Sequence, residues 1–282
     1  MDTGFYAPYH AVAGPTVSTY RYGTYEASYL HDHFFKSVIF SYAPSSYSFP
    51  SLCFLSVKTF GDPDSPYQAA LAKRADKVYP VPGPWIQGGL ITALKNIKAG
   101  LEPPGAADAE DNDGFTTSLP AVLVAPDQGP AVAKLVTTGA TALDHLTLQT
   151  LILNNYLEGG EEPIRRGGES VAAELPELAL EVSEVLAAVE DNSNKSVSEL
   201  VERFGKACPL PGSFKSSLVV LLRCEKDYVG AVRQNILAGG DCNARANFIG
   251  ACLGARLGIE GIPMEWIEKV KLKNFLTKKV VQ

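Results

Sequence analysis

The residues best suited to chemistry follow a pair of glycines near the C-terminal end of the sequence. Gly239 and Gly240 can adopt the left-handed backbone that ends a helix, which places Asp241 where a following helix exposes unpaired amides. A carboxylate at that point has two interpretations. As an N-cap it accepts a hydrogen bond from a backbone amide and stabilises the helix by about 1 kcal/mol. As a functional group it binds a hard metal ion through its oxygens.

Cys242 adds a second kind of chemistry at the same helix start. The helix dipole and the positive charge of Arg245 would stabilise its thiolate, which would make the cysteine reactive. The alternative is a packed cysteine that takes no part in chemistry. Both interpretations stay open from the sequence.

Helical patterns surround this turn and must position its residues. Apolar side chains recur at helical spacing, so we expect helices over residues 85–99, 174–189, 214–223, 227–238, 242–257 and 263–270. Two capping boxes add helix starts at Thr141 and Ser196, and the first opens a buried central helix that ends at Gly159 and Gly160. Residues 101–114 are predicted to be a loop, and hardly any credible strand occurs after residue 80. The predicted fold class is therefore all-α.

Composition restricts the class of protein. The 282 residues are 46% apolar and 20% charged, which is typical of a globular chain. The net charge of −6 disfavours a nucleic-acid partner, because phosphate contacts need concentrated Lys and Arg. Five cysteines without a CxxC pair indicate reduced thiols and a cytoplasmic location. Every apolar stretch is too interrupted to span a membrane, so we expect no membrane partner.

The N-terminal part of the sequence differs from the rest. Residues 1–60 are rich in Tyr, Ser and Pro without a clear period, and we expect this segment to be divergent or poorly ordered. Residues 61–272 form the predicted helical domain, and residues 273–282 form a basic tail. The spacing of His31 and His33 would place both imidazoles on one side of a strand. The nearby sequence offers no further ligand, so this pair does not support a metal site.

Four segments share a recognisable pattern with one known family. They are residues 85–125 with Asp111-Asn112-Asp113-Gly114, Cys208-Pro209-Leu210-Pro211-Gly212-Ser213-Phe214, Asp227-Tyr228-Val229 with Ala231-Val232-Arg233, and Gly239-Gly240-Asp241 with the following helix and Ile262-Pro263-Met264-Glu265-Trp266-Ile267. Together these segments resemble the ADP-ribosylglycohydrolase family over about residues 60–270, and the last one resembles its C-terminal signature.

The resemblance implies an all-helical fold and a site for two magnesium ions. Active members of the family hold these ions between a Thr-Asp-Asp-Thr motif and a Gly-Gly-Asp-x-Asp-Thr motif. Asp241 matches the first carboxylate of the second motif, whereas Asn243 stands at the second carboxylate and Ala244 at the threonine. The first motif does not occur in the sequence. Asp241 and Asn243 are therefore the predicted metal ligands of a magnesium site that is weak or lost.

These changes to the motif resemble a divergent branch of the family, which contains the jellyfish J-type lens crystallins and selenoprotein J. The resemblance implies a protein that hydrolyses or binds ADP-ribosyl groups. The alternative is a non-catalytic, crystallin-like structural protein of the same fold. A binder without metal ions would hold the pyrophosphate of ADP-ribose at Gly239, Gly240 and the helix start at Cys242. No catalytic residue is assigned.

Overall fold

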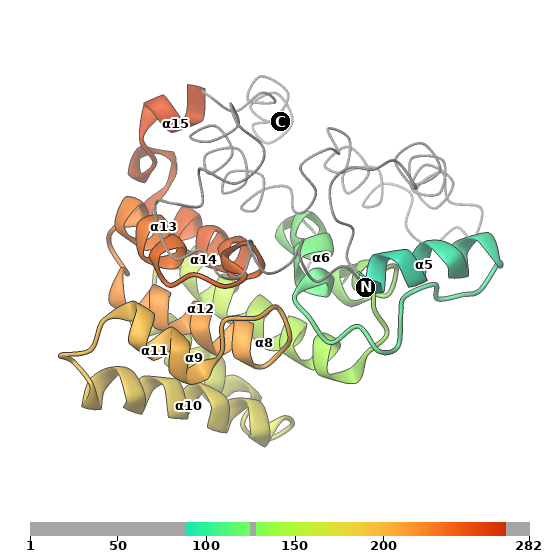
Figure 1. Ribbon diagram of the computed structural model, residues 1–282, viewed down its shortest axis with the longest axis horizontal. Helices are drawn as coiled ribbons and strands as arrows, with labels where there is room; N and C mark the ends of the chain where they lie inside the picture. Colours follow the sequence, from blue (N-terminus) through green and yellow to red (C-terminus); the bar gives the residue numbers. More distant parts are fainter. Residues whose placement is uncertain (1–87, 125–127, 269–282) are drawn as a thin grey trace.

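The computed structural model describes residues 88–124 and 128–268, and every regular element in these ranges is helical. They contain eleven α-helices and one short 3₁₀ helix, without a β-strand (Figure 1). Extended pairing in these ranges consists of isolated bridges between Ala106 and Thr137 and between Asp111 and Pro209. The prediction of an all-α fold is confirmed.

The helices follow one another in chain order with mostly short connections. They are α5 (Gly88–Lys98), α6 (Asp113–Val124), α7 (Gly129–Ala133), α8 (Ala140–Leu157), α9 (Pro163–Val171), α10 (Pro176–Asp191), α11 (Val197–Phe204), α12 (Gly212–Arg223), α13 (Tyr228–Leu237), α14 (Cys242–Leu257), the 3₁₀ helix η5 (Ile259–Gly261) and α15 (Met264–Glu268). All helices expected from apolar periodicity occur, and their bounds within the described ranges differ from the predicted ones by a few residues at most.

Helix α14 is the central helix of the bundle. It packs against α6, α8, α12 and α13. Its residues from Asn243 to Leu253 are all buried. Neighbouring helices can cover so much of its surface because small residues such as Ala246, Gly250 and Ala251 let them come close.

Aromatic rings join the helices α6, α12 and α14. Phe115 of α6 packs edge-on against Phe248 of α14, with ring centroids 5.3 Å apart, and Phe248 meets Phe214 of α12 at 5.8 Å. All three rings are fully buried. Because buried rings contribute large apolar areas to the core, these contacts fix the three helices relative to one another.

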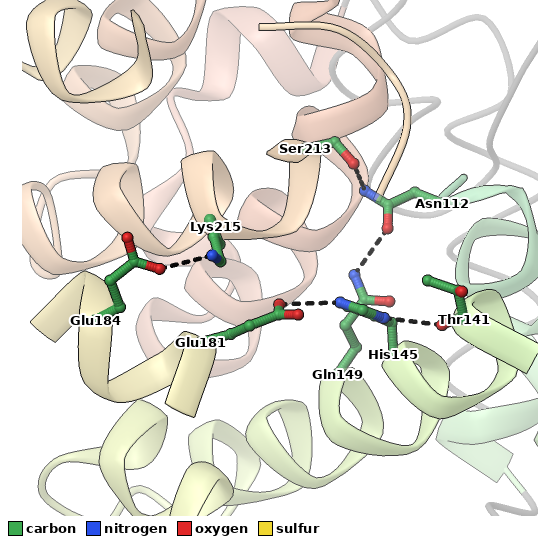
Figure 2. A network of polar contacts seen from close by, with 8 residues as sticks. All are labelled: Asn112, Thr141, His145, Gln149, Glu181, Glu184, Ser213 and Lys215. Carbon is green, nitrogen blue, oxygen red and sulfur yellow. Dashed lines mark hydrogen bonds and ion pairs between the residues drawn. The ribbon is translucent and has the colours of Figure 1, made fainter. Parts of the chain in front are cut away.

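His145 links α8 to α10 and α12. Its Nδ1 lies 2.8 Å from the backbone oxygen of Thr141, and its Nε2 lies 3.2 Å from the Glu181 carboxylate of α10 (Figure 2). The imidazole also packs edge-on against the Phe214 ring at 5.3 Å. Both ring nitrogens are therefore occupied by protein groups, and His145 serves packing in this structure.

The two predicted capping boxes have different outcomes. At Ser196 the box is confirmed, because its hydroxyl accepts from the Glu199 amide at 3.2 Å and the Glu199 carboxylate accepts from the Ser196 amide at 2.8 Å. At Thr141 the predicted box is wrong, because the N-cap of α8 is Gly139, two residues earlier, and the helix begins at Ala140. The Thr141 hydroxyl donates to the Glu110 carboxylate at 3.1 Å instead.

The sequence does not predict α9, because two glycines at its centre have poor helix propensity. The packing of α9 explains them. A Cβ on Gly167 would lie 2.4 Å from Cγ1 of Ile152 on α8, and a Cβ on Gly168 would lie 2.9 Å from Cγ1 of Val182 on α10. Helix α9 thus lies too close to both neighbours for a side chain at either position.

The predictions for residues 1–60, with His31 and His33, and for the tail at residues 273–282 lie outside the described ranges. The predicted domain boundaries at residues 61 and 272 stay predictions for the same reason. Within the described ranges, no helix combines the length and apolar character needed to cross a membrane.

Replacing Ser196 by Ala should destabilise the protein by about 1 kcal/mol, because the Glu199 amide loses its acceptor and the capping box opens. Denaturant unfolding measures this loss. Ser183→Ala is the matched control, since Ser183 is an exposed helix residue whose hydroxyl bonds only to the carbonyl of Ala179 within its own helix. Equal losses in the two variants would contradict the capping account.

Candidate functional site

The turn between α13 and α14 presents Asp241 at the start of the central helix. Gly239 and Gly240 adopt positive φ angles of 69° and 64°, and a Cβ on Gly240 would lie 2.5 Å from the backbone oxygen of Lys206. The Asp241 amide donates to that same oxygen at 2.8 Å. Its carboxylate Oδ1 accepts from the Ala244 amide at 3.0 Å, so Asp241 is the N-cap of α14. The capping interpretation is confirmed. Because Oδ1 is used by the cap, a metal ion bound by Asp241 would be held by its other oxygen, Oδ2.

Arg245 holds this turn in place from inside the protein. Its side chain is 0% exposed, and its guanidinium donates to Oδ1 of Asn235 at 2.8 Å. It also donates to the backbone oxygens of Gly239 at 2.6 Å, Lys206 at 3.1 Å and Asn235 at 3.2 Å. A buried charge is tolerated when its hydrogen-bonding groups are satisfied in this way. The guanidinium therefore fixes the turn, and its charge interacts with that of Asp241.

The structure favours the unreactive interpretation of Cys242. Burial raises the pKa of its thiol to about 11, and this effect outweighs the Arg245 charge, which lowers it. The Cys242 amide donates to the Gly240 oxygen at 3.0 Å, and the Gly239 amide donates to the Ile236 oxygen at 3.0 Å. A pyrophosphate held by Gly239, Gly240 and Cys242 would have to displace these bonds.

Polar side chains line the contact between α6 and α14, which we call the α6–α14 seam. Asn243 is buried in the first turn of α14, and Asn247 follows one turn later. Nδ2 of Asn247 donates to Oγ1 of Thr116 on α6 at 2.8 Å. Its Oδ1 has no hydrogen-bond partner, although Asn247 is only 1% exposed. An unpaired buried oxygen is unfavourable by about 1–3 kcal/mol, so this oxygen of Asn247 lowers the stability of the seam.

The acidic loop before α6 brings two further carboxylates to the seam. Asp111 forms an isolated bridge with Pro209. Beside this bridge, the Leu210 amide donates to the backbone oxygen of Glu110 at 2.9 Å. Asp113 is the first residue of α6, and its amide donates to Oδ1 of Asp111 at 3.1 Å. The loop is thus anchored on the segment that precedes α12.

Asp111, Asp113 and Asp241 lie close enough for their charges to interact. The pKa of Asp111 is raised to about 6, and burial is the largest cause. The hydrogen bond from the Asp113 amide lowers this pKa, and the charge of Asp241 raises it. Burial, together with the charges of Asp111 and Asp241, holds the pKa of Asp113 well above its ordinary value. Among the described residues, no lysine or arginine forms an ion pair with any of the three. These three residues, the carboxylate cluster, therefore have no ion pair within the described residues to offset their burial and mutual repulsion.

The sequence singles out Asp241 and leaves its two acidic neighbours unassigned. Asp111 and Asp113 belong to an acidic loop that matches no metal motif, and they lie far from Asp241 along the chain. The signal that could have found them is their place directly before an apolar helix, where loop carboxylates meet the free amides of the helix start.

The donors of the seam do not suit a pair of metal ions. Within the described residues, no three Asp, Glu, His or Cys side chains gather closely enough to hold a metal ion as they stand. Asn243 offers a neutral oxygen in place of a carboxylate, Ala244 offers none, and the buried guanidinium of Arg245 adds positive charge. The three carboxylates suit at most one hard divalent cation, which would have to draw them together.

Two known proteins are similar to this chain in sequence. It is 27% identical over 196 residues to crystallin J1B and 28% identical over 203 residues to crystallin J1A, both from Tripedalia cystophora. The matches cover 67% and 69% of this chain and 59% and 61% of the two crystallins. The chain thus spans about three fifths of the length of these curated relatives.

A solved structure described as an ADP-ribosylglycohydrolase-related protein complex has a similar fold. The TM-score is 0.56, the match covers 81% of this chain and 77% of that one, and the sequences are 16% identical, so the likeness is one of fold alone. Residues 52–281, which are most of the chain, match the family described as ADP-ribosylglycohydrolase. The chain therefore belongs to the ADP-ribosylglycohydrolase family.

Proposed function

We propose that this protein binds ADP-ribosyl groups at the α6–α14 seam and holds a single magnesium ion there weakly. The proposal is carried by the positions of Asp111, Asp113 and Asp241 near the starts of α6 and α14, where their charges interact although the side chains do not gather closely enough to hold a metal ion as they stand. Family membership supports the class of ligand. Asn243, buried in the first turn of α14, is the neutral oxygen ligand that would complete the set.

The carboxylate cluster opposes folding by itself. Burial and like-charge repulsion raise the pKa of Asp111 and of Asp113, so their charged forms at neutral pH lower the free energy of unfolding. Such unfavourable clusters are typical of sites where stability is given up for binding. A bound magnesium ion would neutralise the cluster and attract hydroxyl and phosphate oxygens of a ligand.

The same carboxyl groups are suited to proton transfer. A carboxyl group such as that of Asp111, with a pKa of about 6, exchanges its proton near neutral pH. The hydrolysis of a glycosidic bond needs a general acid with this property. The Asp113 amide holds Oδ1 of Asp111 in a fixed direction, which leaves the other oxygen to carry the proton. Hydrolysis of an ADP-ribosyl bond is the activity that we propose for Asp111 when it is not bound to the cation, since a carboxylate that ligates Mg²⁺ carries no proton to donate.

A non-catalytic, crystallin-like role is the second candidate function. It is favoured by the two relatives that are named crystallins and by Asn243 and Ala244 at two positions of the metal motif. A purely structural protein gains no stability from repelling carboxylates. The two candidates therefore predict opposite results for ligand binding.

Calorimetric titration with ADP-ribose in Mg²⁺ should show binding that EDTA weakens, and release of ADP-ribose from a modified peptide tests hydrolysis. Asp241→Asn should weaken binding by at least about tenfold, because a charge is lost while the amide oxygen still caps α14. Asp227→Asn is the control, since Asp227 caps α13 in the same way and should leave binding unchanged. If the unaltered protein binds no ADP-ribose, the crystallin-like candidate replaces the proposal.

Asp111→Asn should stabilise the protein at pH 7 by roughly 1–3 kcal/mol, because it removes a charge that burial, and to a lesser extent repulsion by Asp241, disfavours. The amide oxygen can still accept from the Asp113 amide. The same variant should bind Mn²⁺, a paramagnetic substitute for Mg²⁺, less tightly than the unaltered protein. Thermal unfolding and electron paramagnetic resonance measure the two effects. A loss of stability would show that Asp111 is not repelled in the folded state.

The stability difference between Asp111→Asn and the unaltered protein should depend on pH. The pKa of Asp111 is raised to about 6 in the folded state, so its favourable contribution is present below the unfolded pKa and is lost as pH rises through 6. The two proteins should therefore differ least below pH 4, and the advantage of the variant should grow as pH rises from about 4 to about 6 and stay constant above that. Denaturant unfolding across this range measures the difference, and a constant difference would refute the raised pKa.

A further inference from the structure

Two carboxylates of α10 are each bound by a side chain from a different helix. Glu181 lies 3.2 Å from Nε2 of His145 on α8, and Glu184 accepts from Nζ of Lys215 on α12 at 2.7 Å (Figure 2). Helix α10 packs mainly against α9 and α12. The imidazole of His145 therefore adds a polar bond from α8 to a helix that is otherwise held by other neighbours.

Both ring nitrogens of His145 face oxygens that accept hydrogen bonds. Nδ1 lies 2.8 Å from the backbone oxygen of Thr141, which has no proton to give, and Nε2 faces the Glu181 carboxylate. A neutral imidazole carries only one proton. In either tautomer, the lone pair of one nitrogen would face an oxygen at these distances. The ring is only 2% exposed, so solvent would not screen that unfavourable contact.

Two protons on the ring satisfy both contacts. Glu181 could carry the second proton instead, but a carboxylic acid loses its proton about two pH units below an imidazolium. The geometry thus favours an imidazolium that donates to both oxygens. Burial disfavours such a charge, and the carboxylate at 3.2 Å compensates for it.

Charged side chains also occur on the other elements packed around His145. They are Asp113 of α6, Asp144 of α8, Arg166 of α9, Glu177 and Glu184 of α10, Lys215 of α12 and Arg245 of α14, while α7 carries none. The three cations are bound elsewhere, to Glu158, Glu184 and Asn235. Among the described residues, the ion pair of His145 is formed with Glu181. Glu181 is therefore the charge that decides the state of the ring.

We infer that His145 is held as an imidazolium between Thr141 and Glu181, and that this contact is a proton-dependent lock between α8 and α10. In an unfolded chain an imidazole is mostly neutral above about pH 6.5. The folded protein therefore holds one proton more than the unfolded chain above that pH. The contribution of the lock to stability is fully present below about pH 6.5 and is lost as pH rises. The inference goes beyond the proposed function and does not depend on it.

Denaturant unfolding at a series of pH values tests the lock. Between about pH 7 and pH 8.5, the ratio of folded to unfolded protein should fall by up to about tenfold per pH unit relative to Glu181→Gln, because unfolding releases one proton. The substituted amide can donate to Nε2, so a neutral imidazole satisfies both contacts in that variant. Equal pH dependence in the two proteins would overturn the inference.

Glu184→Gln is the matched control on the same helix. It removes a carboxylate from Lys215, which stays charged throughout this pH range. The control should therefore keep the pH dependence of the unaltered protein. A pH dependence like that of Glu181→Gln would show that either carboxylate of α10 has this effect, which would overturn the assignment to His145.

Nitrogen NMR of the full chain, labelled with ¹⁵N-histidine, tests the protonation state directly. At pH 7.5 His145 should carry protons on both ring nitrogens, and its signals are recognised because they change to those of a neutral ring in Glu181→Gln. The measurement uses the folded protein and needs no destabilised variant. A His145 ring with a single proton at pH 7.5 in the unaltered protein would overturn the inference.

Discussion

The burial of carboxyl groups near two helix starts, together with the repulsion between them, is the constraint on which the candidate site depends. Asp241 caps α14, while Asp111 and Asp113 arrive with the loop that begins α6. Their shared environment raises the pKa of both loop aspartates. The contacts around them oppose separation: Arg245 clamps the turn before α14, and Asn112 bonds the loop to that helix. The fold thus keeps an arrangement that is unfavourable without a ligand.

The charges at the seam also distinguish this chain from the metal site that the family resemblance implies. Asn243 removes one negative charge from the motif, and the buried guanidinium of Arg245 brings a positive charge close to Asp241. Asp111 and Asp113, in the loop before α6, add two carboxyl groups near Asp241 from another part of the chain. A balance of three carboxylates against one guanidinium suits one divalent cation better than two, since two cations would repel each other without enough compensating charge.

Local rules predict most of the helices and some of their starts, and they fail where the cause lies elsewhere in the chain. Helix α14 has the predicted bounds, and the Ser196 box forms, because periodicity and capping depend on neighbouring residues. Helix α9 escapes prediction because its glycines are required by Ile152 and Val182 on other helices. The carboxylate cluster escapes for the same reason. The place of Asp111 and Asp113 directly before an apolar helix marks them as carboxylates near a helix start, but it does not reveal that they approach Asp241, since only the packing of α6 on α14 brings the two parts together.

Anomalous diffraction from crystals of the full chain soaked in Mn²⁺ tests the central claim most directly, because it locates the cation and counts it. The account predicts one manganese peak at the α6–α14 seam, bounded by carboxylate oxygens of Asp111, Asp113 and Asp241. Two peaks at the seam would contradict the single-cation site. A seam without manganese, at concentrations that load other sites on the protein, would contradict the binding of a cation by this carboxylate cluster.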